Sequence, residues 1–321
     1  MRESVFCGVG AFLPEKIVTN DDLSLIVDTT DEWIFRRTGI KRRHIMDGDT
    51  VSGMAIKAAK IALDDSGIPT EEIDLIVVAT STPDKTMPSC ATMVQGGLGC
   101  KNAAAFDINA ACSGFLYALS VVDSMIKSGQ ADTVLIIGSE AMSKVIDWTD
   151  RSTCVLFGDG AGAFVLKGRD VTVGSEAGVV CTELHSDGML GDVLYTDGGV
   201  GTTGKAGRIC MKGTVLFEHA VIKLSSAIAA LLESHSLDIN SIDWFVPHQA
   251  NVRIVDLVID RLKFPREKVI LSIDEHANTS SASIPLAMYK AKQQGKIKKG
   301  NLVLLAAVGA GLTWGASLIR L

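Results

Sequence analysis

Long hydrophobic runs are missing from this chain of 321 residues. A membrane-spanning helix needs about 18 or more consecutive apolar residues, and no stretch of the sequence approaches that length, so we expect no membrane partner. The apolar run at residues 5–13 is short and lacks a cleavage site of small residues. It is therefore predicted to be a first strand and not a signal peptide.

Aromatic residues are also scarce, and acidic residues outnumber basic ones. The net charge is −6, aromatics make up 5% of the chain, and no basic stripe or aromatic platform stands out, which excludes a typical nucleic-acid-binding protein. The seven cysteines are scattered without C-x-x-C pairs, and the six histidines lack metal-ligand spacing. These absences predict free thiols in a reducing cytoplasm and no bound metal.

What the chain does contain is hydrophobic residues (47%) and 31 glycines, as expected for a well-packed α/β protein with two domain-sized units. Strand-like and helix-like segments alternate, and their order repeats. Residues 73–77 align with 242–246, and 134–136 align with 303–305 at the same offset along the chain. A shared offset indicates an internal duplication. We expect the halves to be 1–170 and 171–321, which meet in the turn at 168–174.

Cys112 stands between a short strand-like run, 104–108, and an apolar helix-like run, 113–126. A helix N-terminus carries partial positive charge, which favours a thiolate over a thiol. We therefore expect Cys112 to be a nucleophile at the start of a buried helix, with an inert core cysteine as the alternative. Ser281, which aligns with Cys112 at the offset of the duplication, opens a second apolar helix. The two helix N-termini would face each other across a central site.

Two later segments place polar residues beside apolar strands or helices. His248 follows the strand-like run 243–246, and Asn278 precedes the second apolar helix. Taken alone, His248 could bond a neighbouring loop, and the residues around Asn278 could be helix caps. Together, however, a thiolate, an imidazole and an amide can attack a carbonyl and stabilise its developing negative charge.

Two other interpretations of these motifs are weaker. The order Cys, His, Asn also fits papain-like proteases, but their C-G-[SA]-C-[WY] signature is missing. The glycine-rich residues 158–163 match a loose dinucleotide-binding pattern, yet a strand follows them and not a helix. They are therefore predicted to form a hairpin turn.

The longer motifs resemble those of β-ketoacyl-acyl-carrier-protein synthase III. They cover essentially the whole chain: Asp-Glu-Trp-Ile at 31–34, Arg-Thr-Gly-Ile at 37–40, Ala-Cys-Ser-Gly-Phe at 111–115, Phe-Gly-Asp-Gly-Ala-Gly at 157–162, His-Gln-Ala-Asn-Val-Arg-Ile at 248–254, Asn-Thr-Ser at 278–280 and Gly-Ala-Gly-Leu-Thr-Trp-Gly at 309–315. The resemblance implies a thiolase fold with five α-β-α-β-α layers and two mixed sheets. It also implies a homodimer that performs the starting condensation of bacterial fatty acid synthesis.

The resemblance further implies a reaction in two halves. Cys112 would take a short acyl group from coenzyme A, and malonyl-acyl-carrier protein would then lose carbon dioxide and attack the acyl-cysteine. His248 and Asn278 would hold the malonyl thioester oxygen, while the N–H groups of Cys112 and Ala310 would form an oxyanion hole. Coenzyme A thioester would be a substrate, and no metal or redox cofactor would be needed.

Binding residues are implied in the same way. Coenzyme A would contact Trp33 and Arg151 through its adenine, Arg37 through its phosphates and Asn251 through its pantetheine. The acyl pocket would contain Met142, Phe157 and Met87 of the partner subunit, and Arg253 would belong to the carrier-protein docking face.

Three other functions compete with this one. A thiolase would need a second catalytic cysteine late in the chain, and none follows Cys210. A related acyl-coenzyme A condensing enzyme of secondary metabolism would keep the same three residues and stays open as an alternative. A non-catalytic acyl-binding paralogue is disfavoured because Cys112, His248 and Asn278 are all present.

Overall fold

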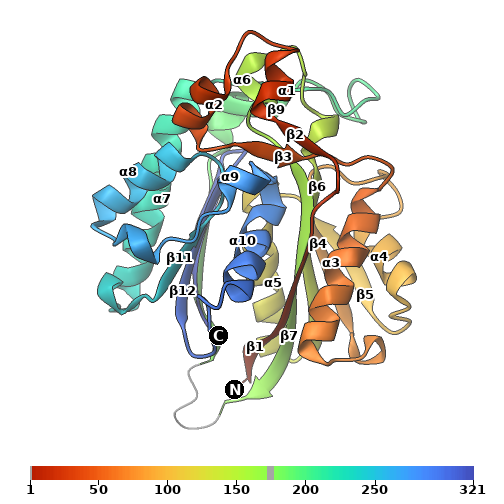
Figure 1. Cartoon of the computed structure of the whole chain (residues 1–321). Coiled ribbons are helices and arrows are strands. Elements are labelled where there is room, and N and C mark those ends of the chain that lie inside the picture. Colours follow the sequence, from red (N-terminus) through yellow and green to blue (C-terminus); the bar gives the residue numbers. More distant parts are fainter. Residues whose placement is uncertain (1, 172–176) are drawn as a thin grey trace.

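Two mixed β-sheets form the framework of the computed structural model, which describes residues 2–171 and 177–321 (Figure 1). In the first sheet β4 is parallel to β5 and β6, whereas β7 is antiparallel to β6 and β1. Its order is β1 (Arg2–Phe12), β7 (Asp159–Asp170), β6 (Thr133–Ala141), β4 (Leu75–Ala79) and β5 (Ala104–Ile108). The second sheet has the order β11 (Trp244–Pro247), β12 (Leu302–Gly309), β13 (Thr313–Arg320) and β8 (Gly178–Ser186), with only β11 and β12 parallel.

Helices fill the space between the sheets and cover their outer faces (Figure 1). The central layer contains α5 (Gly114–Lys127) and α10 (Ser283–Gln293), which share one hydrophobic core with strands of both sheets. The outer helices are α3 (Val51–Ser66) and α4 (Cys90–Leu98) on the first sheet, and α7 (Gly213–Ser234) and α8 (Val252–Leu262) on the second. The five predicted layers are therefore present.

Shorter elements gather at the end of the sandwich opposite the two termini (Figure 1). They are β2 (Ile17–Thr19), α1 (Asn20–Ser24), α2 (Asp31–Thr38), β3 (Arg42–His44), α6 (Arg151–Cys154), β9 (Leu194–Thr196), β10 (Ile209–Met211) and α9 (Ile273–His276). Short 3₁₀ turns connect several elements: η1 (Thr70–Glu72), η3 (Met142–Lys144), η4 (Gly188–Val193), η5 (Ile239–Ser241) and η6 (Arg266–Lys268). Helix α7 has the length and apolarity to cross a membrane, but it packs on the second sheet.

The duplication is visible in the strand register. Leu75 of β4 pairs with Val134 of β6, and the equivalent pair in the second half, Trp244 and Val303, joins β11 to β12. The 3₁₀ turn η2 (Ala111–Ser113) before α5 also corresponds to η7 (Ser280–Ala282) before α10. The division into halves at residue 170 stays a prediction, and residues 172–176 of the expected boundary turn lie outside the described residues.

The glycine-rich segment 158–163 is not a hairpin turn, so that prediction was wrong. Residues 159–163 form the start of β7, with Gly162 inside the strand. A Cβ added at Gly162 would come within 2.7 Å of the Pro285 side chain and 2.9 Å of the Leu286 backbone nitrogen. These glycines therefore allow α10 to approach the sheet closely, a requirement between elements that local sequence patterns do not reveal.

Candidate active site

The candidate nucleophile lies in the tight turn between β5 and α5. Ala111 has a left-handed backbone (φ +47°), and Cys112 after it is buried with 7% of its surface exposed. The loop between β12 and β13 holds this turn, because Ser113 donates to the Thr313 carbonyl and the Thr313 hydroxyl donates to the Ala110 carbonyl, each at 2.9 Å. Gly309 allows the close contact, since a Cβ there would lie 2.7 Å from the Cys112 nitrogen.

Opposing influences act on the protonation of Cys112, and the expected thiolate stays a prediction. Burial raises the pKa of Cys112 to about 12, a hydrogen bond from the Ser280 side chain lowers it, and the nearby Glu140 carboxylate raises it again. Desolvation thus opposes the attraction of the helix N-terminus.

His248 directly follows the last residue of β11, and it is 4% exposed. Its Nδ1 lies 2.6 Å from Oγ of Ser283, and this oxygen also accepts the Gln249 N–H at 3.3 Å. The Ser283 hydroxyl proton is thus directed to Nδ1, which leaves the proton of a neutral ring on Nε2. Nε2 has no hydrogen-bond partner among the described residues. Burial lowers the pKa of His248 to about 3, so the ring is a neutral donor.

Asn278 is fixed by backbone contacts with the end of the first half. Its N–H donates to the Leu156 carbonyl at 2.9 Å, and its carbonyl accepts the Gly158 N–H at 3.0 Å. The side-chain oxygen accepts the Ser280 N–H at 2.9 Å. Because that oxygen is engaged, the NH₂ group is the part of the side chain that can donate to a ligand.

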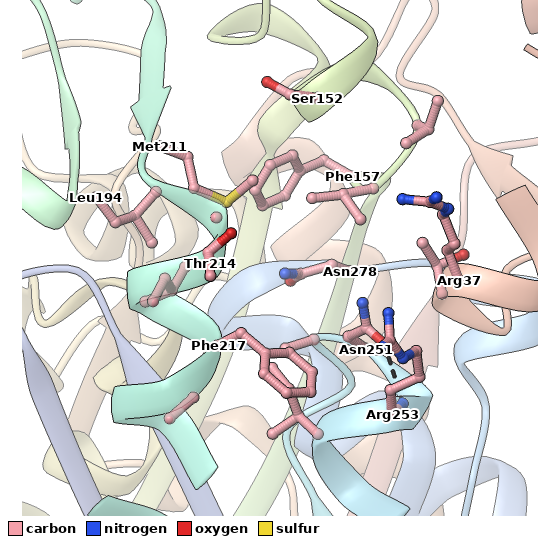
Figure 2. A pocket seen from close by; sticks show the side chains of 18 of the residues that line it. Arg37, Ser152, Phe157, Leu194, Met211, Thr214, Phe217, Asn251, Arg253 and Asn278 are labelled. Atoms are coloured by element: carbon pink, nitrogen blue, oxygen red, sulfur yellow. Dashed lines mark hydrogen bonds between the residues drawn. The ribbon is translucent and has the colours of Figure 1, made fainter. Parts of the chain in front are cut away.

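Cys112, His248 and Asn278 all line one cavity of about 560 Å³. Figure 2 shows Asn278 between Phe157 and Phe217, with Arg37 and Arg253 on one side and Leu194 and Met211 on the other. The candidate nucleophile of the first half therefore shares a cavity with the His248 and Asn278 side chains of the second. In the described part of the chain, no group of three or more His, Cys, Asp or Glu residues is arranged to hold a metal ion.

The mouth of the same cavity is cationic and aromatic. The guanidinium carbons of Arg37 and Arg151 lie 4.5 and 4.9 Å from the Trp33 ring centroid, and all three residues line the cavity. Asn251 caps α8 by accepting the Arg253 N–H at 2.9 Å, and both also line it. The structure thus brings together the residues that were predicted to bind coenzyme A and to begin the docking face.

A second cavity of about 970 Å³ also has Cys112 among its lining residues. Phe157 lines both cavities, whereas Met142 and Ala310 line only this one. Met87 is 82% exposed on the surface of the single chain and is not among the residues that line either cavity in the described parts. Its predicted contribution from a partner subunit stays a prediction.

Sequence reasoning missed three residues around the site: Glu140, Ser280 and Ser283. The two serines resemble ordinary helix caps, and only their contacts with Glu140 and His248 reveal another role. Glu140 offered a signal, since an acidic residue in the apolar segment 134–141 must be buried with hydrogen-bond partners or lie at a site.

Comparison with solved structures identifies the fold. The chain superimposes on 3-oxoacyl-[acyl-carrier-protein] synthase III from Aquifex aeolicus VF5 with a TM-score of 0.94 and 46% identity, covering 99% of this chain and 100% of that one. For the enzyme from Pseudomonas aeruginosa PAO1 the TM-score is 0.93 and the sequence identity 40%, covering 99% of this chain and 98% of that one. For a priming β-ketosynthase of the R1128 polyketide pathway the TM-score is 0.93 and the sequence identity 36%, covering 100% of this chain and 96% of that one. The protein is thus an acyltransferase of the thiolase fold.

Sequence comparison gives the family. Models of 3-oxoacyl-[acyl-carrier-protein] synthase III match residues 106–188 and, for its C-terminal part, 232–321. Curated β-ketoacyl-[acyl-carrier-protein] synthase III proteins from Anaplasma marginale and Ehrlichia canis are 79% and 60% identical, each over 100% of both chains. The chain belongs to the 3-oxoacyl-[acyl-carrier-protein] synthase III family.

Proposed function

We propose that this chain starts fatty acid synthesis by a decarboxylative Claisen condensation between a short acyl-coenzyme A and malonyl-acyl-carrier protein. The observation that carries this proposal is the convergence of Cys112, His248 and Asn278 on one cavity with a cationic, aromatic mouth. Membership of the synthase III family supports the same reaction.

In the first half-reaction, Cys112 attacks the acyl-coenzyme A thioester. The carbonyl oxygen becomes negatively charged, and the N–H groups of Cys112 and Ala310 stabilise it as the oxyanion hole. Coenzyme A leaves as its thiolate, and the acyl group stays on the sulfur as a thioester. The second cavity, beside Met142 and Phe157, holds the acyl chain.

In the second half-reaction, the malonyl carboxylate leaves as carbon dioxide and the electrons move toward the thioester oxygen. Nε2–H of His248 and the Asn278 NH₂ donate to this oxygen. Because both donors are neutral, they stabilise the enolate without quenching it by full protonation, and each contributes about 3 kcal/mol to the transition state. The carbanion then attacks the acyl-Cys112 carbonyl, and the cysteine sulfur departs as a thiolate. No metal or redox cofactor takes part.

Substrate binding uses the mouth of the cavity. Trp33 and Arg151 stack on the coenzyme A adenine, Arg37 meets its phosphates, and Asn251 bonds the pantetheine through its NH₂ group. Arg253 attracts the acidic carrier protein. Asp256, three residues further along α8, forms an ion pair with Arg266.

The working enzyme is a cytoplasmic homodimer. Strand β5 lies at the edge of the first sheet, so its outer side is open to pairing with a second copy. A dimer built there would also allow Met87 to reach the acyl pocket of its partner.

Radiolabelled acetyl-coenzyme A tests the acylation step. We expect label on Cys112 in the wild type and none in Cys112→Ala, followed by release of a β-ketoacyl product when malonyl-acyl-carrier protein is added. Wild-type enzyme that takes no label from a series of acyl donors would contradict the nucleophile assignment. Labelled enzyme that ignores the carrier protein would favour a condensing enzyme of secondary metabolism.

A further inference from the structure

Glu140 is a fully buried carboxyl group that the proposed reaction leaves without a role. It lies in β6 with none of its surface exposed. Such a group is costly unless hydrogen bonds satisfy its oxygens. Its closest donors in the described residues are neutral and come from both halves of the chain: the Ser81 N–H at 3.1 Å, the Thr82 hydroxyl at 2.6 Å, the Ser281 hydroxyl at 2.9 Å and the Ser280 hydroxyl at 3.0 Å. The carboxyl group therefore ties the segment after β4 to the turn η7.

These bonds hold the turn η7 in a strained conformation. Ser280 has a left-handed backbone (φ +50°), which non-glycine residues adopt only where the surroundings enforce it. Both serine hydroxyls of the turn reach the same atom, Oε1 of Glu140, and the Ser281 hydroxyl also lies 2.8 Å from the Ala79 carbonyl. A carboxyl oxygen has two lone pairs and can accept both hydroxyls at once. Glu140 thus supports η7 from the side of the first sheet.

The same turn sets the direction of the Asn278 side chain. The Ser280 N–H donates to Oδ1 of Asn278 at 2.9 Å, and an N–H can bond only the oxygen end of an amide. The Asn278 main chain is fixed separately, by backbone bonds to Leu156 and Gly158. Ser280 therefore contacts Glu140 through its hydroxyl and Asn278 through its N–H. Its position decides where the NH₂ group of Asn278 points in the cavity.

We propose that Glu140 is a positioning residue for Asn278 and acts through Ser280. This role rests on the proposed function for one step, the donation of a hydrogen bond from the Asn278 NH₂ group to the malonyl thioester oxygen. Such a donor stabilises developing charge fully only when it is aimed before the reaction begins. Glu140 provides that aim from outside the site, since it is not among the described residues that line either cavity at Cys112.

Alanine is compatible with the backbone of the turn at position 280. Ala111 occupies the equivalent position before α5 and has nearly the same left-handed conformation, with φ +47°. Ser280→Ala therefore removes the bond to Glu140 and keeps the N–H that Asn278 accepts. What is lost is the restraint that Glu140 places on that N–H, so the turn becomes free to shift.

Carbon dioxide release from malonyl-acyl-carrier protein and acetyl labelling of Cys112 test this role together. In Ser280→Ala, carbon dioxide release should fall about tenfold, because a displaced donor loses much of its effect. Labelling should stay within about twofold of wild type, since Asn278 acts only in the second half-reaction. Ser281→Ala is the matched control, because Ser281 bonds the same oxygen of Glu140 but its N–H is not the one that Asn278 accepts. Its carbon dioxide release should stay within about twofold of wild type.

A double-mutant cycle with Asn278→Ala distinguishes positioning from a general structural effect. Asn278→Ala should itself lower carbon dioxide release about 100- to 1000-fold, and a radiolabelled malonyl group still reveals the remaining rate. In that background Ser280→Ala should cost nothing further, because no amide is left to aim. Glu140→Gln, in which an NH₂ group replaces one acceptor oxygen, should follow the same pattern, with about a tenfold loss when Asn278 is present and none when it is absent.

Equal losses with and without the Asn278 amide would overturn the proposal. So would unchanged carbon dioxide release in Ser280→Ala, or a Ser281→Ala variant that is as slow as Ser280→Ala. Should Glu140→Gln fail to fold by circular dichroism, the cycle with Ser280→Ala decides. Wild-type enzyme that releases no carbon dioxide from malonyl-acyl-carrier protein would instead contradict the proposed function, and with it the role proposed for Glu140.

Discussion

In the first half of the chain the turn Ala111–Ser113 presents Cys112 to the cavity, whereas in the second half the turn Ser280–Ala282 keeps Ser281 away from it. Both turns precede a buried central helix, and each begins with a left-handed residue, Ala111 or Ser280. The Ser281 hydroxyl lies 2.8 Å from the Ala79 carbonyl and 2.9 Å from Glu140. The same backbone conformation therefore presents the candidate nucleophile in one half and buries the equivalent serine in the other.

The sheets differ in a related way. In the first sheet β4 pairs with all of β5, but in the second sheet the corresponding contact of β11 is a single bridge between Phe245 and Val269. The segment beyond Val269 instead leads to Asn278, which pairs with Phe157 of the first half. Because the second half has no full counterpart of β5, this segment can bring Asn278 to the cavity that Cys112 lines.

The largest effect is expected from exchanging the residues of the two turns. Cys112→Ala should lower condensation by at least about 10⁴-fold, since the covalent step is lost. Adding Ser281→Cys to that variant should not restore acylation, because residue 281 is only 1% exposed and faces Glu140. Acetyl label located by peptide mapping is the measurement. Label on residue 281 would show that the two turns are interchangeable.

Removing a donor from the second half should have a smaller and more selective effect. In His248→Ala, malonyl decarboxylation should fall about 100- to 1000-fold because the enolate oxygen loses a preorganised hydrogen bond. Acylation of Cys112 should change much less, since in the proposed reaction the N–H groups of Cys112 and Ala310, and not His248, stabilise the oxyanion of that step. Carbon dioxide release and acetyl labelling, measured on the same preparation, separate the two steps. Equal losses in both would assign His248 to both half-reactions.

Acid should destabilise the protein through its histidines, above all through the two buried ones of the second half. Burial lowers the pKa of both His248 and His276 to about 3. Unfolded histidines bind protons below about pH 6.5 while these two do not, so the free energy of unfolding falls as pH drops from there toward 3. The loss at pH 5 should be about 2 kcal/mol per histidine. Urea unfolding at pH 7 and 5 measures it.

His276→Gln should remove roughly half of this loss between pH 7 and 5, because one of the two buried histidines is gone. His235→Gln, at an exposed position, is the control. An equally steep fall in His276→Gln and wild type would mean that His276 is protonated in the folded state.

The smallest effects are expected from two glycine-to-alanine substitutions, one at a contact between the halves and one at an exposed position. Gly162→Ala places a Cβ 2.7 Å from Pro285 of α10 and should destabilise the protein by about 1–3 kcal/mol. Gly96→Ala in the outer helix α4 meets no atom within 4 Å and should stabilise it by about 0.5–1 kcal/mol. Urea midpoints give both values. A stabilising Gly162→Ala would show that α10 can shift away from the first sheet.

Much of this arrangement could be predicted from the sequence. The shared offset between the halves anticipated the register common to β4–β6 and β11–β12, and the apolar run after Cys112 anticipated the buried helix α5. The segment at Gly162 was misjudged because its glycines serve a contact with α10, which lies in the other half of the chain. Glu140 was missed because a hydrogen-bond network spread over separate segments has no sequence spacing.

The sequence by itself determined which chemical groups the protein possesses, how its two halves repeat, and to which family it belongs, because these depend on residue identity and order. Only the tertiary structure decided their protonation states. Desolvation depends on atoms brought in from every layer, and it raises the pKa of Cys112 while it lowers the pKa of His248.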